Sequence, residues 1–342
     1  MKAIVIHAPR DLRIEERDAP APGPGEVEIR LAVGGVCGSD LHYYNHGGFG
    51  AVRLKEPMIL GHEVSGHVAA LGDGVDGLAV GDLVAVSPSR PCGACEYCAE
   101  GARNHCHDMR FYGSAMPFPH IQGAFRETLI ADAAQCAKAD GLSPALAAMA
   151  EPLSVVLHAA RRAGDLMGKR VLVTGCGPIG CLAILAARAA GAAEIVATDI
   201  APAAMKHAAR CGADTLLDAA DPTALAHWSG GKGAFHAMFE CSGAAAALAA
   251  AIPAIRPQGR ILQLGLGGDM TLPVQAMTAK EIALLGSFRF HEEFSTAVQM
   301  MRSDRIDPTT LITHTMSLDE AEAAFMAAND RTSAMKTQIA FS

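Results

Sequence analysis

The chain of 342 residues has few aromatic side chains, which make up 5% of it and include a single tryptophan. Half of its residues are nevertheless hydrophobic, and 35 are glycines. This composition is typical of an alanine- and glycine-rich α/β protein with an ample aliphatic core. The length favours two domains.

Long apolar runs are also lacking. The longest nearly apolar stretch, 243–255, contains Pro253 and ends before Arg256, so it is shorter than the ~20 residues that a membrane helix needs. We therefore expect no membrane association. The net charge is −8 and the chain contains no block of basic residues, which argues against nucleic acid as a partner.

We also expect no cleavable leader at the start of the chain. The apolar residues 1–6 are followed at once by His7, Pro9 and Arg10. We therefore expect a cytoplasmic protein, in which cysteines are more often metal ligands or free thiols than disulfides.

Four cysteines lie close together in one short segment. Cys92, Cys95 and Cys98 recur at every third residue and Cys106 follows, while Gly93 and Gly101 allow tight turns between them. Four thiolates can close a tetrahedron around zinc, and this spacing predicts a structural zinc site. An iron site, a disulfide pair and redox-active thiols are the alternatives.

A second and sparser group of possible ligands precedes these cysteines. Cys37 follows the apolar stretch 27–36, and His62 with Glu63 lies in the glycine-bounded segment 61–66. One thiolate and one imidazole are only two ligands, and a metal site needs at least one more. Glu63 and Glu151 are the candidates. Taken alone, such residues are usually an ordinary His-Glu pair and a small buried thiol.

A glycine-rich turn follows a predicted strand at 169–174. It reads Gly175-Cys176-Gly177-Pro178-Ile179-Gly180, and a predicted helix at 181–190 comes next. The following strand, 194–198, ends at Asp199. This is the context of a dinucleotide fingerprint, in which the turn approaches the pyrophosphate and the carboxylate binds the ribose hydroxyls.

Asp199 favours NAD over NADP, because a carboxylate repels a 2′-phosphate. No arginine follows it directly, although Lys206 and Arg210 on the next predicted helix could reach such a phosphate.

The longer pattern Gly61-His62-Glu63, with Gly66, Gly72 and Val75, resembles the zinc signature of the medium-chain dehydrogenase/reductase superfamily. The resemblance spans nearly the whole chain. It implies an α/β fold in which a β-rich, GroES-like catalytic domain is formed by residues 1–147 and 289–342. Residues 148–288 would form a doubly wound Rossmann domain. The further strands predicted for that domain are 215–217, 237–240, 260–266 and 282–288, which make six with the two above. The tail from 289 is predicted to form helix, loop, helix and a final strand at 337–341.

The same resemblance implies an enzyme with two zinc ions per chain, one catalytic and one structural, that transfers a hydride to NAD. Ser39 would accept the proton of the substrate hydroxyl and pass it through the cofactor ribose toward His42. Without the resemblance, Ser39 and His42 would be interpreted as a turn hydroxyl and a surface imidazole.

Glu151 stands where many alcohol dehydrogenases supply a second cysteine, and this feature is similar to the sorbitol dehydrogenase-like subgroup. Arg289, in the segment 287–290, resembles an arginine of polyol dehydrogenases and could bind a carboxylate, although it could also pair with Glu292 or Glu293. The segments 37–48 and 286–290 look closest to L-idonate 5-dehydrogenases, so the expected substrate is a polyol or sugar acid.

Several alternatives remain open. Sorbitol, xylitol and L-threonine are the other candidate substrates, and a non-catalytic, nucleotide-binding redox sensor is the alternative class of protein. A homotetramer is the expected assembly.

Overall fold

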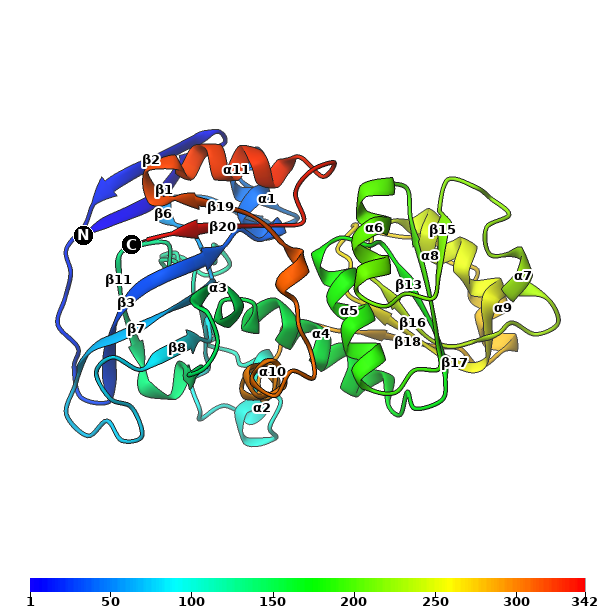
Figure 1. Cartoon of the computed structure of the whole chain (residues 1–342), viewed down its shortest axis with the longest axis horizontal. Helices are drawn as coiled ribbons and strands as arrows, with labels where there is room; N and C mark the ends of the chain where they lie inside the picture. The colour runs from blue at the N-terminus through cyan, green and yellow to red at the C-terminus, as the bar shows by residue number, and fades with distance from the viewer. Residues whose placement is uncertain (342) are drawn as a thin grey trace. The chain divides into compact units, whose positions relative to one another are not determined.

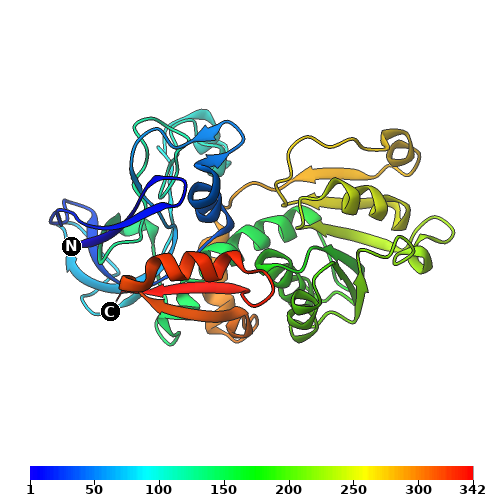
Figure 2. The ribbon, with the colours of Figure 1, turned by 90° about the horizontal axis from the view of Figure 1, so that it is seen from above.

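The computed structural model describes residues 1–341, and these form two compact units. The first unit contains residues 1–151, 290–304 and 312 onward, and the second contains residues 152–289 and 305–311. Figures 1 and 2 follow the chain from blue to red, and both blue and red segments lie in the first unit.

The first unit is rich in β-structure. Its central sheet has the strand order β12-β8-β7-β3-β20-β19, and β11 pairs with β3. A smaller sheet has the order β2-β1-β6, and the pairs β10-β9 and β4-β5 complete the strands. The strands are β1 (Lys2–Ala8), β2 (Asp11–Glu16), β3 (Glu26–Gly35), β4 (Gly48–Phe49), β5 (Val52–Arg53), β6 (Met58–Ile59), β7 (Glu63–Leu71), β8 (Leu83–Val86), β9 (Ser89–Arg90), β10 (Arg110–Phe111), β11 (Thr128–Asp132), β12 (Cys136–Lys138), β19 (Ile312–Ser317) and β20 (Lys336–Ala340).

Short helices accompany these sheets, namely α1 (Gly38–His46), α2 (Glu96–Ala99), α3 (Pro144–Ala147), α10 (Glu293–Arg302) and α11 (Ala321–Asn329). Helix α4 (Ala150–Ala163) begins at the end of the first unit's main segment and continues into the second unit. Buried aliphatic residues of β1, β3, β7 and β8 form the core with Phe125 and Phe325. Because this core holds the central strands rigidly, the ends of β3 and β7 can position side chains accurately.

The second unit is a parallel six-stranded sheet in the order β15-β14-β13-β16-β17-β18, the arrangement of a doubly wound dinucleotide-binding fold. Helices cover both faces of this sheet (Figure 2). Its strands are β13 (Arg170–Thr174), β14 (Glu194–Asp199), β15 (Thr215–Asp218), β16 (Phe235–Glu240), β17 (Ile255–Gln263) and β18 (Ala283–Gly286). Its helices are α5 (Pro178–Ala189), α6 (Pro202–Arg210), α7 (Ala226–Ser229), α8 (Ala245–Ala251) and α9 (Val274–Ala279). The predicted fold class and the six predicted strands are confirmed.

The structure differs most from the prediction at three elements. Helix α5 begins at Pro178 rather than at residue 181, because proline is well suited to the first turn of a helix. Strand β17 begins at Ile255 rather than at residue 260, and its first part is irregular. Strand β19 lies within the segment predicted as loop, where Thr313, His314 and Thr315 give no apolar run.

Among the described residues, no helix combines the length and the apolar character that crossing a bilayer requires.

Candidate active site

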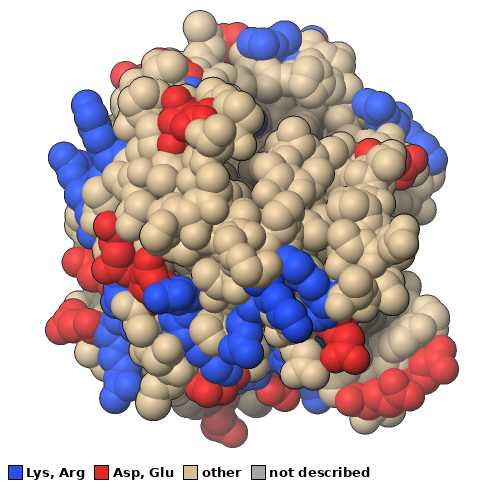
Figure 3. All heavy atoms as spheres, turned by 90° about the vertical axis from the view of Figure 1, so that its right-hand side faces the viewer, with Lys and Arg blue, Asp and Glu red and all other residues tan. Residues whose placement is uncertain are grey.

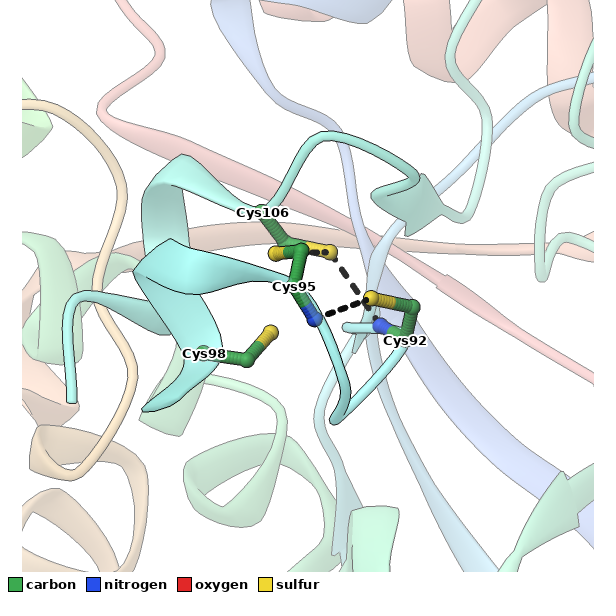
Figure 4. Close-up of side chains that lie close together, drawn as sticks. All are labelled: Cys92, Cys95, Cys98 and Cys106. Atoms are coloured by element: carbon green, nitrogen blue, oxygen red, sulfur yellow. Dashed lines mark hydrogen bonds between the residues drawn. The ribbon is translucent and has the colours of Figure 1, made fainter. Parts of the chain in front are cut away.

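The four cysteines of the first unit converge on one point. Their sulfurs all lie within 4.8 Å of one another, and Figure 4 shows the side chains turned toward a common centre. Gly93 and Gly101 have φ angles of +72° and +83°, so both turns need the left-handed conformation that glycine adopts readily. All ten cysteines of the chain are free thiols, which leaves these four available as ligands.

Backbone N–H groups already point at these sulfurs. The N–H of Cys95 donates to Sγ of Cys92 over 3.4 Å, and the N–H of Cys92 donates to Sγ of Cys106 over 3.2 Å. N–H donors from His107 and Cys98 lower the pKa of Cys95 to about 6, whereas burial raises the pKa of Cys98 to about 12. A divalent cation would draw the remaining protons off, and four sulfurs at this separation suit tetrahedral zinc.

The second group of ligands is built where β3 meets α1. Strand β3 ends at Gly35, and Cys37 is the N-cap residue of α1. Three residues later Asp40 closes a capping box, and its Oδ2 accepts the N–H of Cys37 over 3.0 Å. The helix start therefore fixes the direction of the Cys37 thiol.

His62 and Glu63 come from the beginning of β7, which pairs with β3. Gly61 precedes them with a φ of +90°, and a Cβ there would meet the ring of Phe125 at 2.1 Å. Gly35 pairs with Glu63, and a Cβ at position 35 would meet Oε2 of Glu63 at 2.3 Å. These two glycines therefore make room for the backbone turn and for the carboxylate.

The structure brings Cys37, His62 and Glu63 together. One ligand atom of each lies within 4.8 Å of the others, and His62 and Glu63 are buried, with 5% and 1% of their surfaces exposed. Glu151, at the start of α4, is not part of this three-membered group, but it is also buried. Burial raises the pKa of Glu151 to about 8; the His62 charge opposes this rise, whereas Glu63 and Cys37 add to it.

This environment fits a divalent cation. Burial and the charge of Glu63 raise the pKa of Cys37 to about 12, so the thiol keeps its proton unless a cation replaces it. Nδ1 of His62 is buried and has no hydrogen-bond partner among the described residues; its nearest acidic neighbour is Oδ1 of Asp40 at 3.7 Å. Sulfur, nitrogen and carboxylate oxygen at this spacing are the ligands that zinc takes in open sites.

Two buried residues near this group were not assigned a role from the sequence. Asp40 has no exposed surface, and its Oδ1 accepts the N–H of Gly61 over 3.1 Å, so it links the segment of Cys37 to that of His62. The capping-box spacing was the only signal for it.

Lys336 is the other residue that the sequence did not reveal. It lies in β20, and its Nζ donates to both carboxylate oxygens of Glu63, over 2.9 and 2.7 Å. Burial alone would lower the pKa of Lys336, but the charges of Glu63 and Cys37 outweigh this effect and the pKa is raised. The lysine therefore stays charged and holds Glu63 in place.

Ser39 and His42 lie on α1, one turn apart. Oγ of Ser39 is 3.4 Å from Nε2 of His62, so the hydroxyl borders the metal-ligand group. His42 is exposed, and its ring centroid lies 5.7 Å from that of Phe49. Partial burial, the neighbouring His46 and Arg331 lower the pKa of His42, so its imidazole is neutral at neutral pH.

The glycine-rich turn of the second unit follows β13 and opens α5. Gly175 has a φ of +82°, and a Cβ at Gly180 would meet the carbonyl oxygen of Gly175 at 1.8 Å. A Cβ at Gly177, the N-cap of α5, would meet nothing within 4 Å, which leaves open space beside the N-terminus of the helix. Pro178 and Ile179 open the first turn of that helix; Pro178 has no N–H, but the N–H groups of Ile179 and Gly180 suit a phosphate.

Asp199 ends β14 beside this turn. Its Oδ2 accepts the N–H of Cys176 over 2.6 Å, and its Oδ1 accepts the N–H of Ala201 over 2.8 Å. The carboxylate is thus fixed next to the turn, where it can also accept hydroxyl hydrogens.

Arg289 lies in the second unit, three residues after Gly286, the last residue of β18. It has a φ of +54°, which is unusual for a residue other than glycine, and its guanidinium carbon lies 4.9 Å from the centre of the Phe288 ring.

Comparison with known proteins agrees with both units. Residues 23–141 match the model of the alcohol dehydrogenase GroES-like domain, and residues 178–303 match that of the zinc-binding dehydrogenase family. The chain is 42% identical over 318 residues to L-idonate 5-dehydrogenase (NAD(P)(+)) of Escherichia coli K12, covering 92% of this chain and 91% of that protein. It is 37% identical over 329 residues to human sorbitol dehydrogenase, covering 94% and 91%.

Solved structures give the same result. The crystal structure of L-idonate 5-dehydrogenase from Escherichia coli K-12 superposes with a TM-score of 0.96 at 39% identity, covering 99% of this chain and 98% of that one. An alcohol dehydrogenase from Escherichia coli CFT073, complexed with NADH, has a TM-score of 0.91 at 27% identity, covering 100% and 99%.

A Cys-His-Glu group in a GroES-like domain, joined to a Rossmann domain with a dinucleotide turn, defines a zinc-dependent dehydrogenase. The chain belongs to the zinc-dependent medium-chain dehydrogenase/reductase superfamily, in its polyol dehydrogenase subgroup.

Proposed function

We propose that this enzyme transfers a hydride between a secondary hydroxyl of a polyol or sugar acid and NAD, with L-idonate and 5-ketogluconate as its substrate pair. The observation that carries this proposal is the group Cys37, His62 and Glu63 with Glu151 beside it, in a chain 42% identical to an L-idonate 5-dehydrogenase. A ligand set with glutamate instead of a second cysteine gives a harder, more oxygen-rich metal site.

Two zinc ions per chain are part of the proposal, one held by the four-cysteine group and one by Cys37, His62 and Glu63. Bound there, zinc supplies Lewis acidity that lowers the pKa of a substrate hydroxyl. Asp40 and Lys336 hold the ligands in position, Asp40 through backbone N–H groups and Lys336 through the carboxylate of Glu63. Glu151 borders the site as a fourth ligand or as an acceptor for a bound water.

Proton transfer is assigned to α1. The hydroxyl of Ser39, next to Nε2 of His62, would accept the proton of the substrate hydroxyl and pass it on toward His42. His42 receives it, because its lowered pKa leaves the ring neutral and able to take a proton, and its exposure allows release to water.

NAD is proposed as the preferred cofactor. Bound NAD would supply the hydride acceptor, and the turn 175–180 would hold its pyrophosphate while Asp199 would hold its ribose diol. The fixed carboxylate of Asp199 supports NAD over NADP, since a 2′-phosphate would face its charge. Arg289 is assigned to the carboxylate of a sugar-acid substrate.

A homotetramer in the cytoplasm completes the proposal. A reducing compartment keeps the thiols that both zinc sites need. The three-residue ligand group supports catalysis over the alternative of a nucleotide-binding redox sensor, which would not require an open metal site.

The test is a screen for NADH formation by the zinc-loaded protein with L-idonate, sorbitol, xylitol and L-threonine. We expect L-idonate to have the highest kcat/KM and Arg289→Ala to raise its KM by about tenfold or more, because a hydrogen bond between charged groups is lost. Sorbitol should be little affected by this variant, since it has no carboxylate.

Arg305→Ala is a matched control, because it removes an exposed cation of the same unit for which no substrate contact is proposed. Efficient turnover of sorbitol with inert L-idonate would overturn the sugar-acid assignment. Absence of zinc from the active protein would overturn the mechanism.

A further inference from the structure

A cavity of about 290 Å³ lies in the second unit, at the amino-terminal edge of its sheet. It is lined by residues at the end of α4, by Lys169 before β13, by His236 in β16, and by Arg256 and Arg260 in β17. The dinucleotide turn follows the carboxyl end of β13, so the strand of five residues, about 16 Å long, separates the two places. The cavity is therefore not part of the nucleotide site.

Positive charge collects around this cavity, although the whole chain has a net charge of −8. Lys169, Arg256 and Arg260 line it, and Asp165 is the one acidic residue among the lining residues. Asp165 pairs with Lys169 over 3.4 Å, and Arg170 nearby pairs with Glu194 over 2.6 Å. Figure 3 shows Lys and Arg side chains gathered in a band on one face of the protein.

The two arginines of β17 have no acidic partner among the described residues. Nη1 of Arg260 donates to the carbonyl oxygens of Arg162 and Ala163, over 3.2 and 3.3 Å, which orients the side chain but leaves its charge uncompensated. Arg256 is exposed and forms no ion pair with any described residue. A cavity with an excess of unneutralised guanidinium groups attracts an anion.

The backbone is shaped to present these arginines. Phe235 pairs with Ile255 and Ala237 pairs with Arg260, so the four residues 256–259 stand opposite the single residue His236. Gln258 in this bulge has a φ of +60°, an unfavourable conformation for a residue other than glycine. Bulges of this kind redirect side chains, and strained backbone is found most often where function requires it.

His236 offers a further donor. Its Nδ1 accepts the N–H of Arg170 over 3.2 Å, so in the neutral ring the proton lies on Nε2. Burial and the nearby charges of Arg256, Lys169 and Arg170 lower the pKa of His236. The ring is therefore neutral, and the three cations lie close enough to influence it.

We propose that this cavity binds a small phosphate-bearing metabolite, with Arg256 and Arg260 as its anion-binding residues. Its volume, at the lower end of the range for ligand pockets, suits a phosphorylated three- or four-carbon acid rather than a nucleotide. The planar guanidinium of arginine can donate two hydrogen bonds to the oxygens of one phosphate. Three cations and one histidine suit a ligand group with two negative charges better than they suit a carboxylate, which has one.

The test is calorimetric titration of the zinc-loaded full chain with 3-phosphoglycerate, in the presence of saturating NAD so that the dinucleotide turn is filled. We expect one site per chain and a Kd below about 1 mM. Arg256→Ala should weaken binding by about tenfold or more, and Arg256→Lys should retain part of it. The side chain of Arg256 forms no hydrogen bond or ion pair with a described residue, and it lines the cavity rather than the dinucleotide turn, so these variants should keep the affinity of the wild type for NAD.

Arg305→Ala is the matched control, because Arg305 is an exposed arginine of the same unit that does not line the cavity. It should change the Kd by less than about twofold. Glycerol 3-phosphate has a phosphate but no carboxylate, whereas tricarballylate has carboxylates but no phosphate. Binding of tricarballylate alone would overturn the assignment to phosphate. No binding at about 10 mM, or equal binding by wild type and Arg256→Ala, would overturn the site.

Discussion

Asp40 shows how one buried carboxylate can organise two separate segments. It accepts N–H groups from Cys37 and Gly61, and its Oδ1 lies 3.7 Å from Nδ1 of His62. A carboxylate behind a metal-binding imidazole fixes the orientation of the ring and raises its basicity. Burial raises the pKa of Asp40, and the His62 charge with the two N–H donors counters that rise.

Asp40→Asn should therefore weaken zinc binding at the Cys37 group while leaving the fold intact. The amide has one oxygen for two N–H donors and carries no charge, so we expect a loss of about 10- to 100-fold in zinc affinity. Competition with a chromophoric chelator measures this loss, and circular dichroism checks the fold.

Asp18→Asn is the control, because Asp18 is exposed and remote in sequence from the ligands. Unchanged zinc affinity in Asp40→Asn would show that Asp40 does not position the ligands.

Among the residues of the candidate site, those that belong to a local pattern could be predicted from the sequence. Cys37, His62 and the four cysteines stand in recognisable spacings, and the structure brings them together as two groups. Lys336 could not be found in this way, because it is 273 residues from Glu63 and only the pairing of strands makes them neighbours.

Among the elements, the dinucleotide turn contains two glycines with different roles. Gly180 is needed by the fold, since a Cβ there would meet the carbonyl oxygen of Gly175 at 1.8 Å. Gly177 is not, because a Cβ there would enter open space and its φ of −67° suits any residue.

Gly177→Ala should keep the thermal stability of the protein and raise the KM for NAD by about tenfold or more, because the added methyl group occupies space that a pyrophosphate would approach. Gly180→Ala should instead lower the melting temperature, since either the turn or α5 must shift. Thermal unfolding and initial rates over a range of NAD concentrations give both values. Equal KM values for Gly177→Ala and wild type would place the pyrophosphate elsewhere.

The elements that were predicted correctly are those with a strong apolar pattern. Strands β13, β14 and β16 are almost fully buried, and their hydrophobic runs are evident in the sequence. Strand β19 is polar and half exposed, and it exists because its backbone pairs with β20. The start of β17 was missed because Pro257 and Gly259 read as a turn, and the strand does bulge there.

In the whole molecule, the candidate metal sites and the candidate nucleotide site belong to different units. Both groups of metal ligands lie in the first unit and the dinucleotide turn lies in the second. A ligand stabilises the structure that binds it, by about 2.7 kcal/mol at 100 times its Kd.

Differential scanning calorimetry should therefore distinguish zinc from NAD. Chelation of zinc should lower a transition by at least about 5 °C, and a fixed concentration of NAD should raise a transition less in Gly177→Ala than in wild type. If chelation leaves the whole profile unchanged, the metal sites do not contribute to the stability of the first unit.

Lys336 also has a consequence for synthesis of the protein. It lies in β20, the strand that is inserted between β3 and β19. During translation, Cys37, His62 and Glu63 leave the ribosome long before their countercharge does. The four-cysteine group can take up its metal early, but the reaction centre is completed only after Lys336 has been synthesised. A chain that stopped before Lys336 would contain every proposed metal ligand but not the cation that holds Glu63.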